Sequence, residues 1–301
     1  MDLIKKDKTL IVIVGPTAIG KTALSIDLAQ HFLCPILSFD SRQFYREMNI
    51  GTAKPTLDEL NQADHYFIGN LSIHDHYTAG IYERQALERL DLLFQQHDYC
   101  VAVGGSGLYI DALAYGIDDI PSDEEVRKKL QKRWKEEGLS ALSEQVKLID
   151  PSFYEASDMQ NSRRVIRALE VYEITGKTYT ELRKKTPKSR PFNIKWIGLN
   201  IERELLFNRI NKRVENMMEM GLLQEVEQLL EHREVKALKT VGYREFFGYF
   251  DGEYSLDHAI ALIQRNTRHY AKRQVTWFKK NSDVLWYEPQ DFNKILEEII
   301  K

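Results

Sequence analysis

The residues GPTAIGKT at positions 15–22 constrain the fold of this 301-residue chain more than any other segment. They match the phosphate-binding loop pattern, in which a first glycine is followed by four residues and then by Gly20, Lys21 and Thr22. The preceding run TLIVIV (9–14) is typical of a buried strand, and the following TALSIDLAQHFL has helical spacing. A strand, a loop and a helix in this order are the context in which the pattern binds phosphate.

The chemistry of this loop follows from its residue types. Its glycines let the backbone curl so that successive N–H groups face a diphosphate. Lys21 adds a mobile positive charge, and the Thr22 hydroxyl is the expected Mg²⁺ ligand. The motif therefore predicts a phosphate-containing ligand together with Mg²⁺, but it does not identify that ligand as ATP.

The rest of the chain alternates strands with helices. Further β-rich runs are PILSF (35–39), YCVAV (99–103), KWIGLNI (195–201) and VLWYE (284–288). This alternation predicts an α/β fold whose core is a P-loop NTPase-like parallel sheet. Residues 121–189 contain no convincing strand and have helical spacing, with Gly138 and Gly176 as expected helix stops. We therefore expect a core made of residues 1–120 and 190–301 and an inserted all-helical domain at 121–189.

Two further strands of the predicted sheet end in residues that suit a site. PILSF leads into Asp40, which should lie near the loop because ligands bind beyond the carboxyl ends of parallel strands. This carboxylate fits a Mg²⁺-side ligand, a general base or a simple turn former. YCVAV ends in Gly104 and Gly105, which fit either close backbone approach to a ligand or a tight turn between strand and helix.

Charge is nearly balanced over the whole chain but segregated along it. The net charge is −3, whereas residues 258–282 hold six Lys/Arg and no acid. Residues 160–190 hold nine Lys/Arg against three acids. On a helical projection of residues 258–280 the basic side chains fall within an arc of roughly 140°, largely opposite an apolar one. Such a helix fits contact with a phosphate backbone, and the alternative is an ordinary solvated face.

Several segments together resemble one family. They are GPTAIGKT, DSRQFYREMNIGTAKPT (40–56), GGSGLYIDAL (104–113), RRVIRALEVYEITGKT (163–178), VGYRE (241–245) and KRQVTWF (272–278). In this order they resemble the bacterial tRNA dimethylallyltransferases, also called tRNA isopentenyltransferases, from about residue 9 to 288. The resemblance implies transfer of a dimethylallyl group from dimethylallyl diphosphate to the N6 amine of the adenine immediately 3′ of the anticodon, with release of diphosphate. It also implies that the loop binds this donor rather than ATP, although ATP-binding is a label of the family.

The resemblance assigns roles residue by residue. It implies that Asp40 is the general base and that Thr17, Lys21 and Arg213 act on the leaving diphosphate. The diphosphate-binding set it implies is Gly15, Pro16, Thr17, Ala18, Ile19, Gly20, Lys21, Thr22 and Arg213, with Thr22 as the Mg²⁺ ligand. The tRNA-binding set that we expect is Asp40, Ser41, Arg42, Gln43, Ser106, Arg127, Arg163, Arg164, Arg167, Arg268, Lys272 and Arg273.

Other features indicate ordinary structural roles. Cys34 and Cys100 lie in or beside apolar runs, as core thiols of a reducing cytoplasm would. No segment approaches the roughly 18 apolar residues of a membrane span, and no protein partner is implied. His74 and His76 lack a third metal ligand, and the aromatic residues at 246–250 fit a core better than a base-stacking surface.

Two other functions remain compatible with the phosphate loop. A P-loop nucleotide or small-molecule kinase would explain the loop and Mg²⁺ but not the basic helix. Isopentenyl transfer to free adenine nucleotides would use the same donor site. We expect the anticodon stem-loop of tRNA to be preferred, because a long polyanion requires spaced positive surfaces.

Overall fold

The computed structural model describes residues 8–184 and 186–301. Residues 1–7 of the predicted core and Lys185 of the predicted insertion lie outside the described residues. The chain divides into two compact units, one made of residues 1–114 and 189–301 and one made of residues 115–188. The boundaries predicted from the sequence were 120/121 and 189/190, so the first of them lies six residues earlier in the structure.

The larger unit is built on a parallel sheet. Its strands are β1 (Thr9–Val14), β2 (Ile36–Ser38), β3 (His65–Tyr66), β4 (Tyr99–Val103), β5 (Asn193–Leu199) and β6 (Leu285–Tyr287). They are arranged in the order β3-β2-β4-β1-β5-β6, and each neighbouring pair is parallel. All six residues of the central strand β1 are buried, as expected for a parallel strand covered on both faces. The predicted fold class, an α/β core with a parallel sheet, is confirmed.

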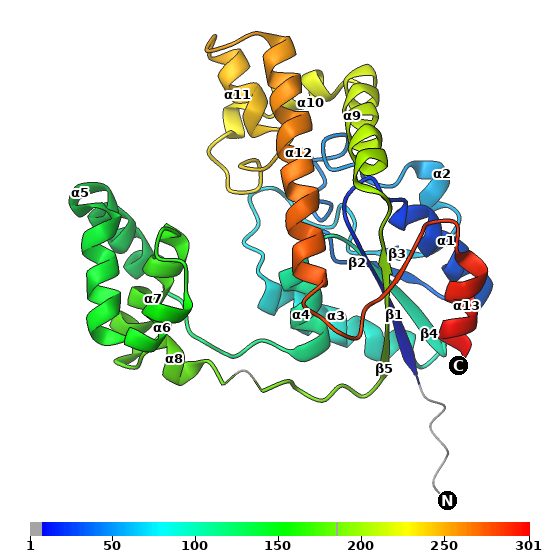
Figure 1. The fold of residues 1–301 in the computed structure, drawn as a ribbon, viewed down its shortest axis with the longest axis horizontal. Coiled ribbons are helices and arrows are strands. Elements are labelled where there is room, and N and C mark those ends of the chain that lie inside the picture. The colour runs from blue at the N-terminus through cyan, green and yellow to red at the C-terminus, as the bar shows by residue number, and fades with distance from the viewer. Residues whose placement is uncertain (1–7, 185) are drawn as a thin grey trace, which may run out of the picture. The chain divides into compact units, whose positions relative to one another are not determined.

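Helices cover both faces of the sheet. Those of the larger unit are α1 (Lys21–Phe32), α2 (Leu57–Leu60), α3 (Ala79–Leu93), α4 (Gly107–Tyr115), α9 (Arg203–Glu219), α10 (Leu222–Gln228), η1 (Leu230–His232), α11 (Arg244–Phe250), α12 (Leu256–Phe278) and α13 (Phe292–Ile300). Ile11 and Ile13 of β1 point to the face on which α1 and α13 pack. The alternating residues Leu10 and Val12 are buried on the other face, where Figure 1 shows α3 and α4.

A second cluster of apolar side chains holds the helices that follow β5. Val214 of α9, Val226 of α10, Phe246 of α11 and Ile263 of α12 meet in it. Tyr45 and Met48, from the loop after β2, pack into the same cluster. Figure 1 shows α9, α10, α11 and the first part of α12 gathered beyond one end of the strands, and α12 continues from there toward α4.

The smaller unit is helical throughout its regular structure. Its helices are α5 (Glu124–Ile149), α6 (Pro151–Ala156), α7 (Ser162–Thr175) and α8 (Tyr179–Leu182). Gly138 interrupts α5 with a φ of 83°, and Gly176 ends α7 in the left-handed conformation, so both predicted stops bend or end a helix. Leu130, Val146, Val165 and other side chains give the unit a core of its own.

The strand predictions were correct in position with two exceptions. KWIGLNI (195–201) was predicted as a strand, but β5 begins earlier, at Asn193, and ends at Leu199. The two-residue strand β3 was missed, because it is too short to give a periodic signal.

Candidate active site

The phosphate loop connects the buried strand β1 to helix α1. Gly15 adopts a φ of 144°, and a Cβ atom there would lie 2.6 Å from the carbonyl oxygen of Leu199. Gly20 is left-handed at the N-cap of α1, with a φ of 107°. Ala18 also has a positive φ of 64°, a conformation that non-glycine residues seldom adopt outside turns and functional sites. The backbone is therefore curled as a phosphate-binding loop requires.

Lys21 folds back over this loop. Its Nζ atom donates to the carbonyl oxygens of Gly15 at 3.1 Å and of Pro16 at 2.8 Å. Gly15 and Pro16 thus hold the Lys21 side chain with their carbonyl oxygens and do not line the adjoining cavity. Residues 17–22 do line it.

Two helices from far along the chain fasten the loop at Thr17. Arg213 of α9 donates to the Thr17 hydroxyl at 3.0 Å. The backbone N–H of Thr17 donates to Oε1 of Gln274, on α12, at 2.9 Å. The structure therefore brings the predicted residue Arg213 to the phosphate loop, which sequence spacing alone does not show.

Lys21, Arg213 and Asp40 share one electrostatic environment. Desolvation lowers the pKa of Lys21 to about 8; the Asp40 carboxylate opposes this shift and the Arg213 guanidinium adds to it. Desolvation also lowers the pKa of Arg213 below its ordinary value, again opposed by Asp40. Two cations beside one carboxylate leave net positive charge at the loop, which suits a ligand with more than one negative charge.

Asp40 follows β2 and serves both as a turn former and as a cavity residue. Its Oδ1 accepts the backbone N–H of Arg42 at 3.0 Å, and its own N–H donates to the Ser38 hydroxyl at 3.2 Å. The neighbouring Ser41 N–H donates to Oγ of Ser106 at 2.9 Å. The turn therefore fixes a carboxylate at the carboxyl end of the sheet, next to the phosphate loop.

Gly104 and Gly105, after β4, are required by protein neighbours. A Cβ at Gly104 would lie 2.5 Å from the Phe39 ring, and one at Gly105 would lie 2.0 Å from Nε2 of Gln274. Gln274 donates to the Gly105 carbonyl oxygen at 3.0 Å. The sequence suggested either close approach to a ligand or a tight turn at these glycines. The structure shows that the close neighbours are side chains of the same chain, Phe39 and Gln274.

A cavity of about 470 Å³ opens beside the phosphate loop. Of the predicted site residues, it is lined by Thr17, Ala18, Ile19, Gly20, Lys21, Thr22, Asp40, Ser41, Arg42, Gln43 and Arg213. Apolar side chains of α9 and α12 form part of its wall, namely Ile210, Val214, Met217 and Ile263. This apolar wall was not predicted from the sequence, and neither were the lining residues 51–53 and 240–242. The sequence predicted only that these apolar residues of α9 and α12 lie on helices.

Predicted RNA-contact residues at the cavity already have protein partners. Arg42 donates to the carbonyl oxygen of Ala237 at 3.2 Å. Gln43 donates to the carbonyl oxygens of Thr52 and Ala53 at 3.2 and 2.9 Å. These contacts tie the segment after Asp40 to the surrounding loops.

Helix α12 has the two faces that its sequence predicts. Its buried residues are Ala259, Ile263, Ala271, Gln274 and Phe278, and its exposed residues include Arg265, His269, Lys272 and Arg273. Arg268 is half-buried and donates to Oδ1 of Asn211 at 2.6 Å. Trp277 of the same helix is 41% exposed, and its indole N–H donates to Asp111 at 2.9 Å. The helix ends at Phe278, before Lys279 and Lys280.

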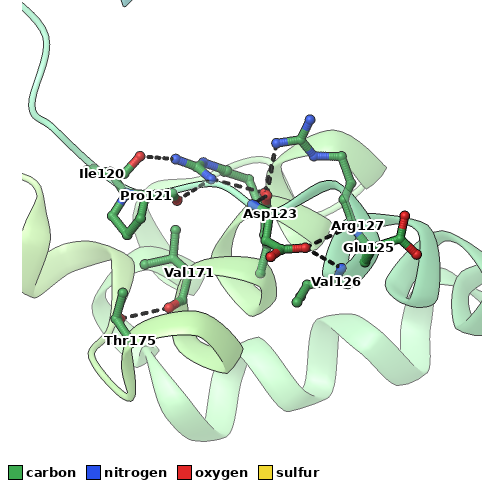
Figure 2. A network of polar contacts seen from close by, with 10 residues as sticks. Ile120, Pro121, Asp123, Glu125, Val126, Arg127, Val171 and Thr175 are labelled. Carbon is green, nitrogen blue, oxygen red and sulfur yellow. Dashed lines mark hydrogen bonds and ion pairs between the residues drawn. The ribbon is translucent and has the colours of Figure 1, made fainter.

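In the smaller unit, Arg127 and Arg167 converge on the buried carboxylate of Glu170. Arg127 donates to Glu170 at 2.9 and 3.2 Å, and Arg167 donates to it at 3.0 Å. Arg167 also donates to the carbonyl oxygens of Ile120 and Pro121, each at 2.8 Å. Figure 2 shows this network around Arg127, Asp123 and the chain at Ile120 and Pro121.

The exposed arginines of α7 differ from these two. Arg163 and Arg164 are exposed to solvent, whereas Arg167 is held by Glu170. Arg163 and Arg167 lie four residues apart on one helix. Only Arg167 of the two has its guanidinium held in an ion pair with Glu170.

The two cysteines and the aromatic residues at 246–250 lie in apolar surroundings. Cys34 and Cys100 are buried free thiols, and burial raises the pKa of Cys34 to about 12. Phe246 is buried, and the aromatic residues after it pack against the same cluster. Within residues 8–184 and 186–301 no group of three or more His, Cys, Asp or Glu side chains is placed to hold a metal ion. Among the same residues no helix is both long and apolar enough to cross a membrane.

Comparison with known proteins decides the family. A model of the IPP transferase family matches residues 43–281. The chain belongs to the IPP transferase family. Among relatives in this family, a protein of Phocaeicola vulgatus named tRNA dimethylallyltransferase 1 is 47% identical over 292 residues, which cover 97% of each chain. A protein of the same name from Bacteroides thetaiotaomicron is 48% identical over 290 residues, covering 96% of this chain and 94% of its own.

Solved IPP transferase structures share the fold. The full-length tRNA isopentenylpyrophosphate transferase of Bacillus halodurans is 35% identical, with a TM-score of 0.70 over 97% of this chain and 94% of its own. A eukaryotic dimethylallyltransferase acting on tRNA is 27% identical, with a TM-score of 0.78 over 95% of this chain and 75% of its own.

Proposed function

We propose that this chain is a tRNA dimethylallyltransferase. It transfers a dimethylallyl group from dimethylallyl diphosphate to the N6 amine of an adenine in tRNA, at the position immediately 3′ of the anticodon. The names of its relatives and solved neighbours support the donor class and the tRNA acceptor. The acceptor position rests on the resemblance of its motifs to the same family.

One observation carries the proposal at the level of geometry. A single cavity is lined both by the phosphate loop with Lys21 and Arg213 and by the apolar side chains of Ile210, Val214 and Met217. An allylic diphosphate has a strongly anionic end and a small apolar end, so it matches both walls. This combination supports a prenyl donor over a hydrophilic phosphate ester.

The residues at the anionic wall suit the departure of diphosphate. The bond between C1 of the allyl group and the diphosphate oxygen breaks as the bond from C1 to N6 of adenine forms. Negative charge then grows on the leaving group, where Lys21, Arg213 and the loop N–H groups stabilise it. Thr17 shares a hydrogen bond with Arg213 and so aligns that guanidinium with the loop.

Asp40 suits the acceptor side of the reaction. The lone pair of an adenine amine is delocalised into the ring, so the amine is a weak nucleophile and must lose a proton as the new bond forms. The Asp40 carboxylate accepts that proton as general base, a contribution of typically 10²–10⁴-fold in rate. An adenine stacked in an anticodon loop cannot reach the cavity, so the base is flipped out of the stack.

The donor set fits Mg²⁺. Thr22 lines the cavity at the first turn of α1, so its hydroxyl offers the kind of oxygen ligand that Mg²⁺ prefers. The absence of a dedicated carboxylate cage among the described residues fits an ion that takes its other ligands from substrate phosphate and water. When bound, Mg²⁺ supplies positive charge against the leaving diphosphate.

Positive surface in both units supports a polyanionic acceptor. The exposed basic side chains of α12 include Lys272 and Arg273, and α7 exposes Arg163 and Arg164. A free adenine nucleotide needs only a small pocket, so these surfaces favour tRNA over the nucleotide-modifying alternative.

Product analysis tests the proposal. Purified protein is incubated with dimethylallyl diphosphate, Mg²⁺ and unmodified tRNA, and the digested nucleosides are analysed by mass spectrometry. The expected product is N6-dimethylallyladenosine in the anticodon loop, formed together with diphosphate. Phosphate transfer from ATP without any prenylated nucleoside would establish the kinase alternative instead.

A further inference from the structure

Gln274 is a buried polar residue on α12 whose side chain points toward the phosphate loop rather than toward solvent. It is 5% exposed. Its amide uses both ends: Oε1 accepts the N–H of Thr17 at 2.9 Å, and Nε2 donates to the carbonyl oxygen of Gly105 at 3.0 Å. One side chain therefore joins the loop after β1 to the loop after β4.

The surroundings of this amide fit closely around it. A Cβ atom at Gly105 would lie 2.0 Å from Nε2 of Gln274, so the absence of a side chain at position 105 makes room for the bridge. Thr17 is held from the other side by Arg213, at 3.0 Å. Thr17 therefore holds the phosphate loop between two helices, because it contacts Arg213 of α9 and Gln274 of α12.

Helix α12 has different tasks on its two faces. Its exposed residues Lys272 and Arg273 precede Gln274 in sequence and belong to the predicted RNA-contact surface. Gln274 itself is on the buried face and lines the cavity. The three residues are consecutive in sequence, but Lys272 and Arg273 face solvent whereas Gln274 faces the protein interior.

We propose that Gln274 is a positioning residue of the donor site, acting through Thr17. It holds the phosphate loop in the shape in which Lys21, Arg213 and the loop N–H groups meet the diphosphate of the donor. It does not contact RNA. This inference rests on the proposed function for the identity of the donor, dimethylallyl diphosphate.

The test compares Gln274→Met with wild type. Methionine has a similar length and volume but makes neither hydrogen bond, so the loop populates its donor-binding shape less, and a roughly tenfold drop in that population lowers donor affinity by about tenfold. We expect the Kd for dimethylallyl diphosphate, measured without RNA, and the KM for this donor to rise by at least about tenfold. The KM for tRNA and its salt dependence should stay the same.

Gln264→Met is the matched control. Gln264 lies on the same helix, and its amide donates to the carbonyl oxygen of Asn211 at 3.5 Å, away from the phosphate loop. It should leave the donor Kd unchanged. An unchanged donor Kd in Gln274→Met would overturn the inference, and so would a lower melting temperature with donor affinity retained. A rise in the KM for tRNA alone would place Gln274 on the RNA surface instead.

Gly105→Ala provides a second, independent variant. Its added methyl group should displace the Gln274 amide and weaken donor binding in an otherwise wild-type chain. In a Gln274→Ala background the same change should cost little, so the two substitutions should be non-additive. Additive effects would contradict the bridge. Failure of wild type to bind the donor would count against the proposed function, whereas binding by wild type and Gln274→Met alike would count against the inference alone.

Discussion

The charge of Lys21 depends on pH in a range that an assay can reach. Desolvation lowers its pKa to about 8, so the free protein loses this positive charge as the pH rises through that value. We expect kcat/KM for dimethylallyl diphosphate to fall above pH 8, because kcat/KM reports groups of the free enzyme. In Lys21→Arg the charge persists, and this decline should disappear. A wild-type profile that stays flat to about pH 10, close to the ordinary pKa of lysine, would contradict the lowered pKa of Lys21.

The two roles of Asp40 can be separated by Asp40→Asn. Asparagine retains an oxygen that accepts the N–H of Arg42, so the turn observed at 3.0 Å persists while the base is lost. We expect kcat to fall by about 10²–10⁴-fold with donor and tRNA affinities nearly unchanged. Rescue of the rate by excess Mg²⁺ would instead identify Asp40 as a metal-side ligand.

Single residues differ in how far the sequence predicts them. Lys21 and Thr22 are fixed by the motif and the adjoining strand and helix, so their positions follow from local sequence. The direction of Gln274 depends on how α12 packs, and local sequence does not determine this. Arg167 was predicted to contact tRNA, and its ion pair with Glu170 could not be predicted because the burial of Glu170 is a tertiary property.

Among the elements, α5 and α7 are joined through Glu170, which is fully buried and accepts hydrogen bonds from two arginines. Arg167→Ala removes one charged partner from this carboxylate, at a cost of about 1–3 kcal/mol. We expect faster hydrogen exchange at the amides of α5 and α7. Arg163→Ala removes an exposed side chain of the same helix and should leave exchange unchanged while weakening tRNA binding. Equal exchange in both variants would exclude a structural role for Arg167.

The exposed face of α12 makes a separate electrostatic prediction. Lys272 and Arg273 are exposed, so replacing both by alanine should weaken tRNA binding. The slope of log Kd against log salt should fall by roughly one for each phosphate that is no longer neutralised. Donor affinity should not change. Lys294→Ala, on α13, is the control because that lysine is paired with Asp291 at 2.7 Å. A slope equal to that of wild type would make the basic face of α12 an ordinary solvated surface.

For the whole molecule, the alternation of strands and helices was sufficient to predict the sheet, and glycine positions indicated helix interruptions. The exact start of the inserted unit was not predictable, because α4 runs to Tyr115 and only tertiary contacts mark where the larger unit ends. The backbone N–H of Lys188 donates to the carbonyl oxygen of Tyr115 at 2.8 Å, so the two connecting segments lie side by side at this boundary. Pairing between residues so far apart in the chain leaves no local sequence signal.

The central claim is that the acceptor is an adenine within tRNA, and acceptor discrimination tests it most directly. Wild-type kcat/KM is measured with dimethylallyl diphosphate and Mg²⁺ for an unmodified anticodon stem-loop and for adenosine monophosphate. Because the exposed basic side chains of α12 and α7 are more numerous than the phosphate of one nucleotide can neutralise, we predict a strong preference for the stem-loop. Comparable turnover of the two acceptors would contradict this account and indicate a nucleotide-modifying enzyme.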